Sequence, residues 1–120
     1  MSYIGIDGQE ITQASLLPEV ARRLEIERRH QDSIVFFHDE DFYAVYGDPA
    51  KVVASRFGLS MNSISVTRSG QTIYECTVPE HLISRFSAEL GLMGYPTALC
   101  QTMTVGGKHH NYVRSWFVTD

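Results

Sequence analysis

The pattern of apolar and charged positions predicts a helix near the start of the chain. Between about Ser15 and His30, apolar side chains recur at the spacing of one helix face. These apolar residues are Leu17, Val20, Ala21 and Leu24, and the charged residues opposite them are Arg22, Arg23, Glu25, Arg28 and Arg29. Pro18 falls in the first turn, where a proline is tolerated. We expect the charged face to be solvated.

Two further prolines mark the starts of two more helices. Asp48 suits the N-cap position and Pro49 the first helical position, so a short helix is predicted to begin there and to end near Gly58. Another helix is predicted to begin at Pro79 and to end near two glycines further along the chain. Its apolar face consists of Leu82, Ile83, Phe86 and Leu90.

Runs rich in β-branched and aromatic residues predict the strands of a sheet. The predicted strands are residues 33–38, 42–46, 64–67, 72–77, 97–100 and 111–118. Three consecutive acids, Asp39, Glu40 and Asp41, are interpreted as the tip of the first hairpin, and Ser69-Gly70 as the turn of the second. This order of elements predicts an α/β fold, with a mixed β-sheet flanked by about three helices.

Length and composition predict one soluble domain. A chain of 120 residues is long enough for one hydrophobic core, so residues 1–120 are taken as a single domain in which the structure of residues 1–14 is left open. Hydrophobic residues make up 43% and charged residues 20%, as in ordinary globular proteins. Neither a secretory signal nor a segment of membrane-spanning length is present, so a cytoplasmic protein without membrane contact is expected.

The charge and the cysteines exclude several kinds of site. Ten Lys and Arg residues against fourteen Asp and Glu residues leave a net charge of -4, which argues against strong sequence-independent binding to nucleic acid. Residues 101–119 nevertheless lack acidic side chains, so a local basic face is compatible with the sequence.

Cys76 and Cys100 lie in apolar runs and are interpreted as reduced core residues. Because no zinc-ligand spacing occurs, we expect neither a metal nor a cofactor.

Five short patterns, in order and in register, resemble the N-terminal mismatch-recognition domain (domain I) of MutS-type DNA repair proteins. They are Ile34-Val35-Phe36-Phe37 with Asp41-Phe42-Tyr43, similar to the family's "GDFYE" element; Asp48-Pro49-Ala50-Lys51, similar to the start of its next helix; Ile64-Ser65-Val66-Thr67-Arg68, similar to "ISLT"; Val78-Pro79-Glu80-His81, similar to "VPYH"; and Gly94 to Gln101, similar to "GYKVAICEQ". The resemblance covers roughly residues 20–118.

The resemblance implies a domain that probes duplex DNA from the minor groove. In the family, the Phe of a Phe-x-Glu motif wedges beside a mispaired base and the Glu hydrogen-bonds that base. Phe42 matches the wedge, but Ala44 occupies the position of the Glu and cannot make that hydrogen bond. Arg68 and Arg114 match basic residues near the DNA backbone. The resemblance also implies that restoring the carboxylate, with Ala44→Glu, would increase mismatch discrimination.

The expected function is that of a stand-alone, non-catalytic module that binds duplex DNA weakly. The chain contains no GxxxxGK[ST] motif, so no phosphate-binding loop and no ATPase are expected. The alternative is an interaction domain that kept the fold, lost DNA binding and docks onto a DNA-processing protein. The net charge, Ala44 and the three acids of the hairpin favour this alternative, whereas Phe42 and Arg68 favour DNA.

The same residues are also compatible with other interpretations. Phe42 is also compatible with a core position, and both arginines with solvated surface positions. Asp39, Glu40, Asp41 and Lys51 would suit a metal-dependent nuclease, His109-His110 a metal site, and Cys76 or Cys100 with His81 a nucleophile. Exposure at a hairpin tip explains the acids without a nuclease site, a loop explains the histidines, and no motif supports the nucleophile.

Overall fold

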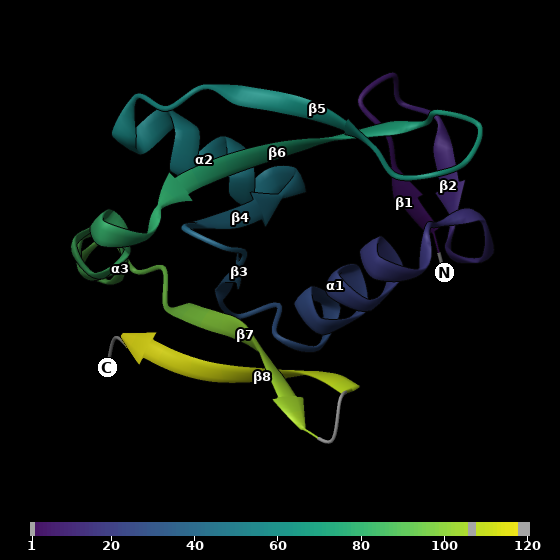
Figure 1. Ribbon diagram of the computed structural model, residues 1–120. Helices are drawn as coiled ribbons and strands as arrows, with labels where there is room; N and C mark the ends of the chain where they lie inside the picture. Colours follow the sequence, from purple (N-terminus) through teal and green to yellow (C-terminus); the bar gives the residue numbers. More distant parts are fainter. Residues whose placement is uncertain (1, 106–107, 118–120) are drawn as a thin grey trace. The chain divides into compact units, whose positions relative to one another are not determined.

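The computed structural model describes the backbone of residues 2–105 and 108–117 and the side chains of residues 3–101. Contacts between residues divide the chain into two compact units. Unit 1 combines the residues up to Arg29 with Tyr46–Cys76, and unit 2 combines His30–Val45 with the residues from Thr77 onward. Each unit is therefore built from two separate segments of the chain. Figure 1 labels the helices and strands and colours them along the sequence.

Unit 1 contains two helices and two antiparallel hairpins. Strands β1 (Ser2–Ile4) and β2 (Glu10–Thr12) form the first hairpin, which the weak pattern of residues 1–14 did not predict. A short 3-10 turn, η1 (Gln13–Ser15), leads into helix α1 (Pro18–Arg29). Helix α2 (Gly47–Phe57) is followed by the hairpin of β5 (Met61–Ser65) and β6 (Thr72–Pro79).

The core of unit 1 contains residues from each of these helices and from the second hairpin. Its buried apolar residues include Ile11, Leu24, Ala50, Val53, Val66, Ile73 and Cys76. The hairpin turns at Gly70, whose φ of 88° is accessible to glycine at little cost. The Gly70 amide donates a hydrogen bond to the Thr67 carbonyl oxygen at 3.1 Å. The predicted Ser69-Gly70 turn is thereby confirmed.

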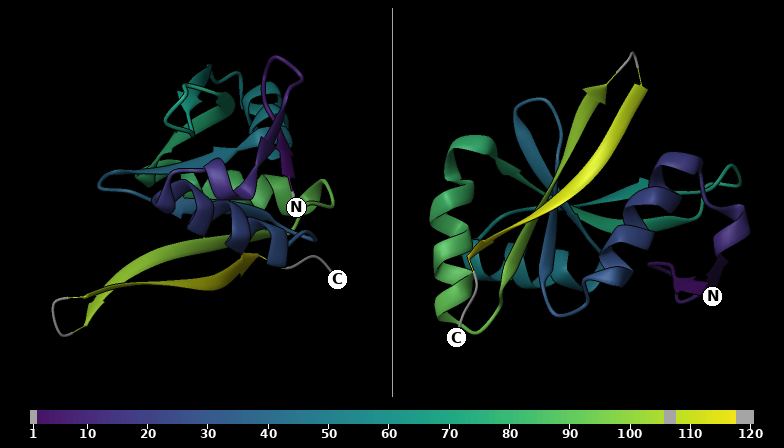
Figure 2. Two further views of the ribbon diagram at one scale, coloured as in Figure 1. Left: turned by 90° about the vertical axis from the view of Figure 1, so that its right-hand side faces the viewer. Right: turned by 90° about the horizontal axis from the view of Figure 1, so that it is seen from below.

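Unit 2 contains a four-stranded mixed sheet. Its strands are β3 (Ile34–His38), β4 (Phe42–Tyr46), β7 (Thr97–Val105) and β8 (Lys108–Phe117). They lie in the order β4-β3-β7-β8. Strand β3 pairs antiparallel with β4 and parallel with β7, and β7 pairs antiparallel with β8. The last two strands form the long curved hairpin visible in Figure 2.

A helix directly precedes the second of the two parallel strands of unit 2. The 3-10 turn η2 (Glu80–Leu82) leads into α3 (Ile83–Leu92), which contacts β7 and β8. Strand β3 lies between two partner strands, and its first four residues, among them Val35, Phe36 and Phe37, are buried, so that both faces of the strand are covered. This explains why the sequence of β3 is a continuous apolar run rather than an alternating one. The predicted α/β fold, a mixed sheet with three helices, is confirmed.

Two predicted helix starts are wrong in detail. Asp48 is not the N-cap of α2, because the helix begins at Gly47 and Tyr46 occupies the cap position. The Asp48 carboxylate instead lies in the first turn, where the helix dipole favours a negative charge. Pro79 does not begin a helix either, since its ψ of 140° is extended and it ends β6. The predicted helix end at Gly58 is confirmed, with a left-handed C-cap at φ 66°.

The last two strands begin or end outside the predicted ranges. Strand β7 extends five residues beyond the predicted end at Cys100, and β8 begins at Lys108 rather than Asn111.

Within the part of the chain that the structure describes, no helix has the length and apolar character needed to cross a membrane.

Candidate nucleic-acid interface

The hairpin of β3 and β4 holds the predicted wedge residue at its tip. Phe42 is the first residue of β4, directly after the acidic turn of residues 39–41. The turn is closed by a hydrogen bond from the Asp39 amide to the Phe42 carbonyl oxygen at 2.9 Å. It is also held from outside, because the Glu80 amide donates to the Asp41 carbonyl oxygen at 3.0 Å. The backbone at Phe42 is therefore fixed by two contacts.

Phe42 is half-buried. The next four residues of β4 are buried, so Phe42 marks the point where the strand leaves the interior. The residue as a whole is therefore neither fully exposed nor fully buried. This arrangement differs from the fully exposed wedge and from the fully buried core position that the sequence allowed. A partly anchored ring can present an apolar edge to a ligand with little loss of conformational entropy.

Ala44 lies two residues further along β4 and is 0% exposed. It pairs across the hairpin with Phe37 of β3, which is also buried. A glutamate at position 44 would therefore begin inside the protein rather than at a surface. This changes the expectation for Ala44→Glu, since burying an unpaired carboxylate is costly.

His38 and Glu80 also contact the tip, and the sequence did not single out either for this role. The His38 ring stacks on the ring of Tyr43, with centroids 4.7 Å apart and planes inclined by 30°. The Tyr43 hydroxyl accepts a hydrogen bond from Gln101 Nε2 at 3.4 Å. His38 Nε2 lies 3.6 Å from Glu80 Oε2, within the range of an ion pair when the imidazole is protonated. These side chains form a polar layer beside the turn.

The acids of the tip supply negative charge but no metal site. Glu40 and Asp41 are exposed and Asp39 is half-buried. No group of three or more His, Cys, Asp or Glu residues within the described residues could hold a metal ion. Lys51, the fourth member of the nuclease alternative, belongs to unit 1, where its ammonium lies 3.4 Å from Asp48 Oδ1 and 5.3 Å from the Tyr74 ring centroid. These placements give the nuclease interpretation no support.

Arg68 is exposed on the β5–β6 turn of unit 1. The turn is held by its own hydroxyls, since Thr67 Oγ1 accepts a hydrogen bond from the Gln71 amide at 3.0 Å and lies 3.0 Å from Ser69 Oγ. Beside it is a pocket of about 460 Å³. The pocket is lined by Ala14, Ser15, Leu16, Leu17, Pro18, Thr67, Arg68 and Ser69. A guanidinium next to several hydroxyls is a suitable environment for a phosphate oxygen.

The remaining predicted basic residue lies on the last strand. Arg114 belongs to β8 and its backbone is paired with Leu99 of β7. Its side chain, like those of His109 and His110, lies outside the residues whose side chains are described. Phe42, Ala44 and Arg114 thus belong to unit 2, and Arg68 belongs to unit 1.

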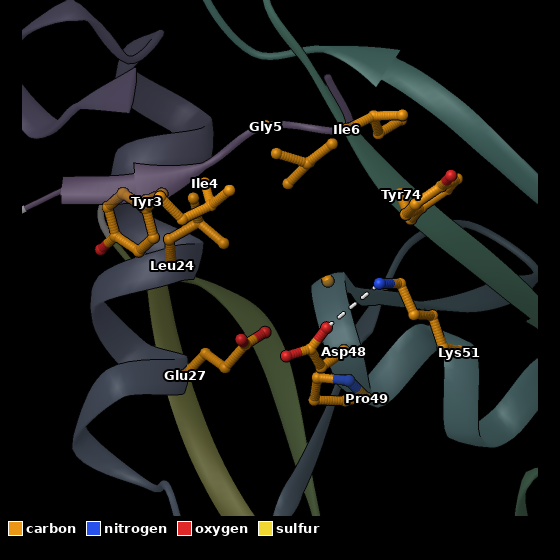
Figure 3. A pocket seen from close by; sticks show the side chains of 12 residues that line it. Tyr3, Ile4, Gly5, Ile6, Leu24, Glu27, Asp48, Pro49, Lys51 and Tyr74 are labelled. Carbon is orange, nitrogen blue, oxygen red and sulfur yellow. Dashed lines mark ion pairs between the residues drawn. The ribbon is translucent and has the colours of Figure 1, made fainter. Parts of the chain in front are cut away.

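A second pocket in unit 1 contains two carboxyl groups (Figure 3). Its volume is about 450 Å³, and it is lined by Tyr3, Ile4, Gly5, Ile6, Leu24, Glu27, Gly47, Asp48, Pro49, Lys51, Ile73 and Tyr74. Figure 3 shows the carboxyl group of Glu27 pointing toward that of Asp48. Burial, followed by the nearby charge of Asp48, raises the pKa of Glu27 to about 7. The Glu27 Oε2 atom is buried without a hydrogen-bond partner.

Both cysteines are buried and neither forms a disulfide, which agrees with the prediction of reduced core residues. Burial, followed by the charge of Glu75, raises the pKa of Cys76 to about 11. A thiol with this pKa is almost fully protonated at neutral pH and is a poor nucleophile. The nucleophile alternative for Cys76 therefore finds no support.

The family described as MutS domain I matches residues 18–119. The chain belongs to this family. DNA mismatch repair protein MutS of Bacillus pumilus is 34% identical over 88 residues, which are 73% of this chain and 10% of that protein. The corresponding values for MutS of Caulobacter vibrioides are 31% identity over 94 residues, 78% of this chain and 10% of the relative. The chain thus spans about a tenth of the length of these relatives.

MutS of Thermodesulfovibrio yellowstonii is more distant, at 27% identity over 92 residues, 77% of this chain and 11% of that protein. The match to MutS domain I includes every residue that carried the resemblance, from Ile34 to Gln101. The family assignment made from the five sequence patterns is confirmed.

Ala44→Glu tests whether the reading position is buried in this MutS domain I. We expect the substitution to lower the free energy of unfolding by about 3 to 5 kcal/mol, because it places an unpaired charge in the interior. Ala44→Gln, which adds similar volume without charge, is the matched control and is expected to cost less. Urea unfolding at pH 7.5 measures both. An Ala44→Glu variant as stable as the wild type, with improved mismatch discrimination, would restore the expectation drawn from the sequence.

Glu27→Gln tests the raised pKa of Glu27 in the second pocket. Because the folded-state pKa of Glu27 is raised from 4.5 to about 7, its contribution to stability is present below about pH 4.5 and is lost as the pH rises through 7. Glutamine mimics the neutral form, so the variant should gain on the order of 1 to 3 kcal/mol at pH 8 and almost nothing at pH 4.

Glu25→Gln is the control for this measurement, because Glu25 lies on the exposed face of the same helix and pairs with Arg29 at 2.7 Å. Its effect should be small. Thermal unfolding across pH 4 to 8 gives both profiles. Equal profiles for the two variants would contradict the assigned pKa of Glu27.

Proposed function

We propose that this domain is a non-catalytic DNA-binding module of the MutS domain I type, which binds duplex DNA weakly. Phe42 contacts the base pairs and Arg68 contacts the phosphate backbone. The observation that carries the proposal is the partly accessible Phe42 ring on a hairpin tip held by two backbone hydrogen bonds. The family membership and the names of the relatives, DNA mismatch repair proteins, support the choice of ligand.

The physical basis of recognition is the energy needed to unstack DNA. Inserting an apolar ring at a base step costs a few kcal/mol, and this cost is lower where a mismatch has already weakened stacking. Phe42 can contribute this term without a carboxylate partner. A hydrogen bond to a charged group is worth about 1.5–3 kcal/mol, and Ala44 cannot supply it. We therefore propose a small preference for mismatched or flexible steps.

Electrostatics limits the affinity. The net charge is -4, and three acids lie at the tip that would approach the phosphates. We propose dissociation constants in the nonspecific range, about 10⁻⁴ to 10⁻⁶ M at physiological salt. The chain contains no GxxxxGK[ST] motif, and we propose that it neither binds nor hydrolyses ATP.

A protein partner remains the second candidate function. The acidic tip and the buried Ala44 favour it, because both weaken the reading of a base. In this case the same hairpin would contact a DNA-processing protein. The DNA titrations described next separate the two functions.

Phe42→Ala tests the wedge. We expect the variant to remain folded, because the ring is only half-buried, and to lose whatever preference the wild type has for mismatched over matched duplex. Fluorescence polarization at low salt with matched, mismatched and branched duplexes measures this. Tyr95→Ala is the control, since Tyr95 is an aromatic residue of unit 2 that is 41% exposed and far from the tip in the sequence.

Two outcomes would contradict the wedge. Unfolding of Phe42→Ala would show that the ring belongs to the core, and equal losses in Phe42→Ala and Tyr95→Ala would show that the contact is unspecific. A folded wild-type protein that binds none of the three duplexes would make the interaction domain the better proposal.

Arg68→Gln tests the backbone contact. We expect weaker binding to all duplexes alike and a plot of log affinity against log salt whose slope is smaller by about one, because one phosphate contact is lost. Arg56→Gln removes another exposed arginine of unit 1, at the end of α2, and serves as the matched control. If both variants change the slope equally, Arg68 has no particular role in binding.

A further inference from the structure

Glu80 makes two different contacts with the hairpin that carries Phe42. Its amide donates to the Asp41 carbonyl oxygen at 3.0 Å, on the side of the turn next to Phe42. Its carboxylate lies 3.6 Å from His38 Nε2, at the end of β3. A single residue of η2 therefore reaches the residues on both sides of the turn.

The contact between the Glu80 carboxylate and His38 is not a hydrogen bond in the structure. The separation of 3.6 Å exceeds hydrogen-bond distance, and Nε2 is buried without a hydrogen-bond partner. The stacked Tyr43 ring restricts the orientation of the imidazole. A neutral imidazole donates from Nε2 only in the tautomer that carries its proton there, whereas in a protonated imidazole both ring nitrogens are donors and the ring is charged, so Nε2 donates to the Glu80 carboxylate as a cation. A charge-assisted hydrogen bond of this kind is stronger than a neutral one.

We propose that the contact between His38 and the Glu80 carboxylate, called the clasp below, positions the hairpin tip that carries Phe42. Protonation of His38 strengthens this contact by turning it into a charge-assisted hydrogen bond. The inference rests on the proposed role of Phe42 in DNA binding. His38 and Glu80 are positioning residues in this proposal, because they act on the ring through the turn. Neither residue needs to contact DNA.

The ionisable groups around the clasp are mostly acidic. Asp39 follows His38 in the turn, Tyr43 faces it from β4, and Glu80 faces it from η2. Asp41 is tied to Glu80 through the backbone. A proton on His38 therefore adds one positive charge to a group of carboxylates that would otherwise repel phosphates. The ordered tip and the weaker repulsion between carboxylates and phosphates both favour DNA binding at lower pH.

The first test uses the protein without DNA. The ring NMR signals of His38 report its protonation directly, so in a pH titration the amide signals of Asp41 and Phe42 should shift together with them. His38→Gln should abolish this pH dependence. Glu80→Gln, at a side chain that is 52% exposed, keeps the backbone contact and should uncouple the Phe42 amide from the His38 ring.

His81→Gln is the matched control. His81 is exposed and directly follows Glu80, so its replacement removes a neighbouring histidine without changing the clasp. We expect the Asp41 and Phe42 signals of this variant to follow pH as in the wild type. The proposal is overturned if these signals do not follow His38, or if His81→Gln abolishes the effect as fully as His38→Gln does.

The second test measures affinity for a mismatched duplex at pH 6 and pH 8 at equal ionic strength. Wild type and His81→Gln should lose roughly two- to fivefold in affinity from pH 6 to pH 8, whereas His38→Gln and Glu80→Gln should lose little, since a partly exposed ion pair has a modest energy. A coupled NMR response without any DNA binding would leave the clasp intact and reject the proposed function. An uncoupled response rejects the clasp even where DNA binds.

Discussion

The pairing of β3 between β4 and β7 is the constraint on which the candidate site depends. A parallel neighbour on one side and an antiparallel neighbour on the other leave β3 without a free edge, and its side chains are buried on both faces. The strand therefore has almost no freedom to shift its register, because a shift of one residue would exchange every buried position. The position of the turn after His38, and of the start of β4 at Phe42, is therefore fixed by the register of β3.

The local elements could be predicted because their signals lie close together in the sequence. The apolar run of residues 34–37 and the acidic turn after it predicted the first hairpin, and the glycine at position 70 predicted the second. The errors occurred where one residue type suits two structures. Pro79 is equally compatible with the end of a strand and the start of a helix, and only the path of the chain toward η2 decides between them. Asp48 favours either a cap or a first turn for the same electrostatic reason.

The candidate site could be predicted only in part. Phe42, Ala44 and Arg68 were found from their places in short motifs, whereas His38 and Glu80 are far apart in the sequence and belong to no common pattern. Their contact depends on the tertiary position of η2 beside the hairpin, and the periodicity of the sequence does not indicate that position. The same holds for Glu27, whose raised pKa depends on burial and on Asp48 of a different helix.

The alanine at position 44 and the burial of β4 have one physical explanation. The four residues after Phe42 are buried, so a side chain at position 44 meets protein rather than solvent. A methyl group is compatible with this packing and needs no hydrogen-bond partner, whereas a carboxylate would need both a partner and access to water. The packing of β4 thus favours an apolar residue where the family resemblance places a glutamate. Recognition through this hairpin then depends on the one side chain of the motif that remains partly accessible, Phe42, and on the contacts that hold its turn in place.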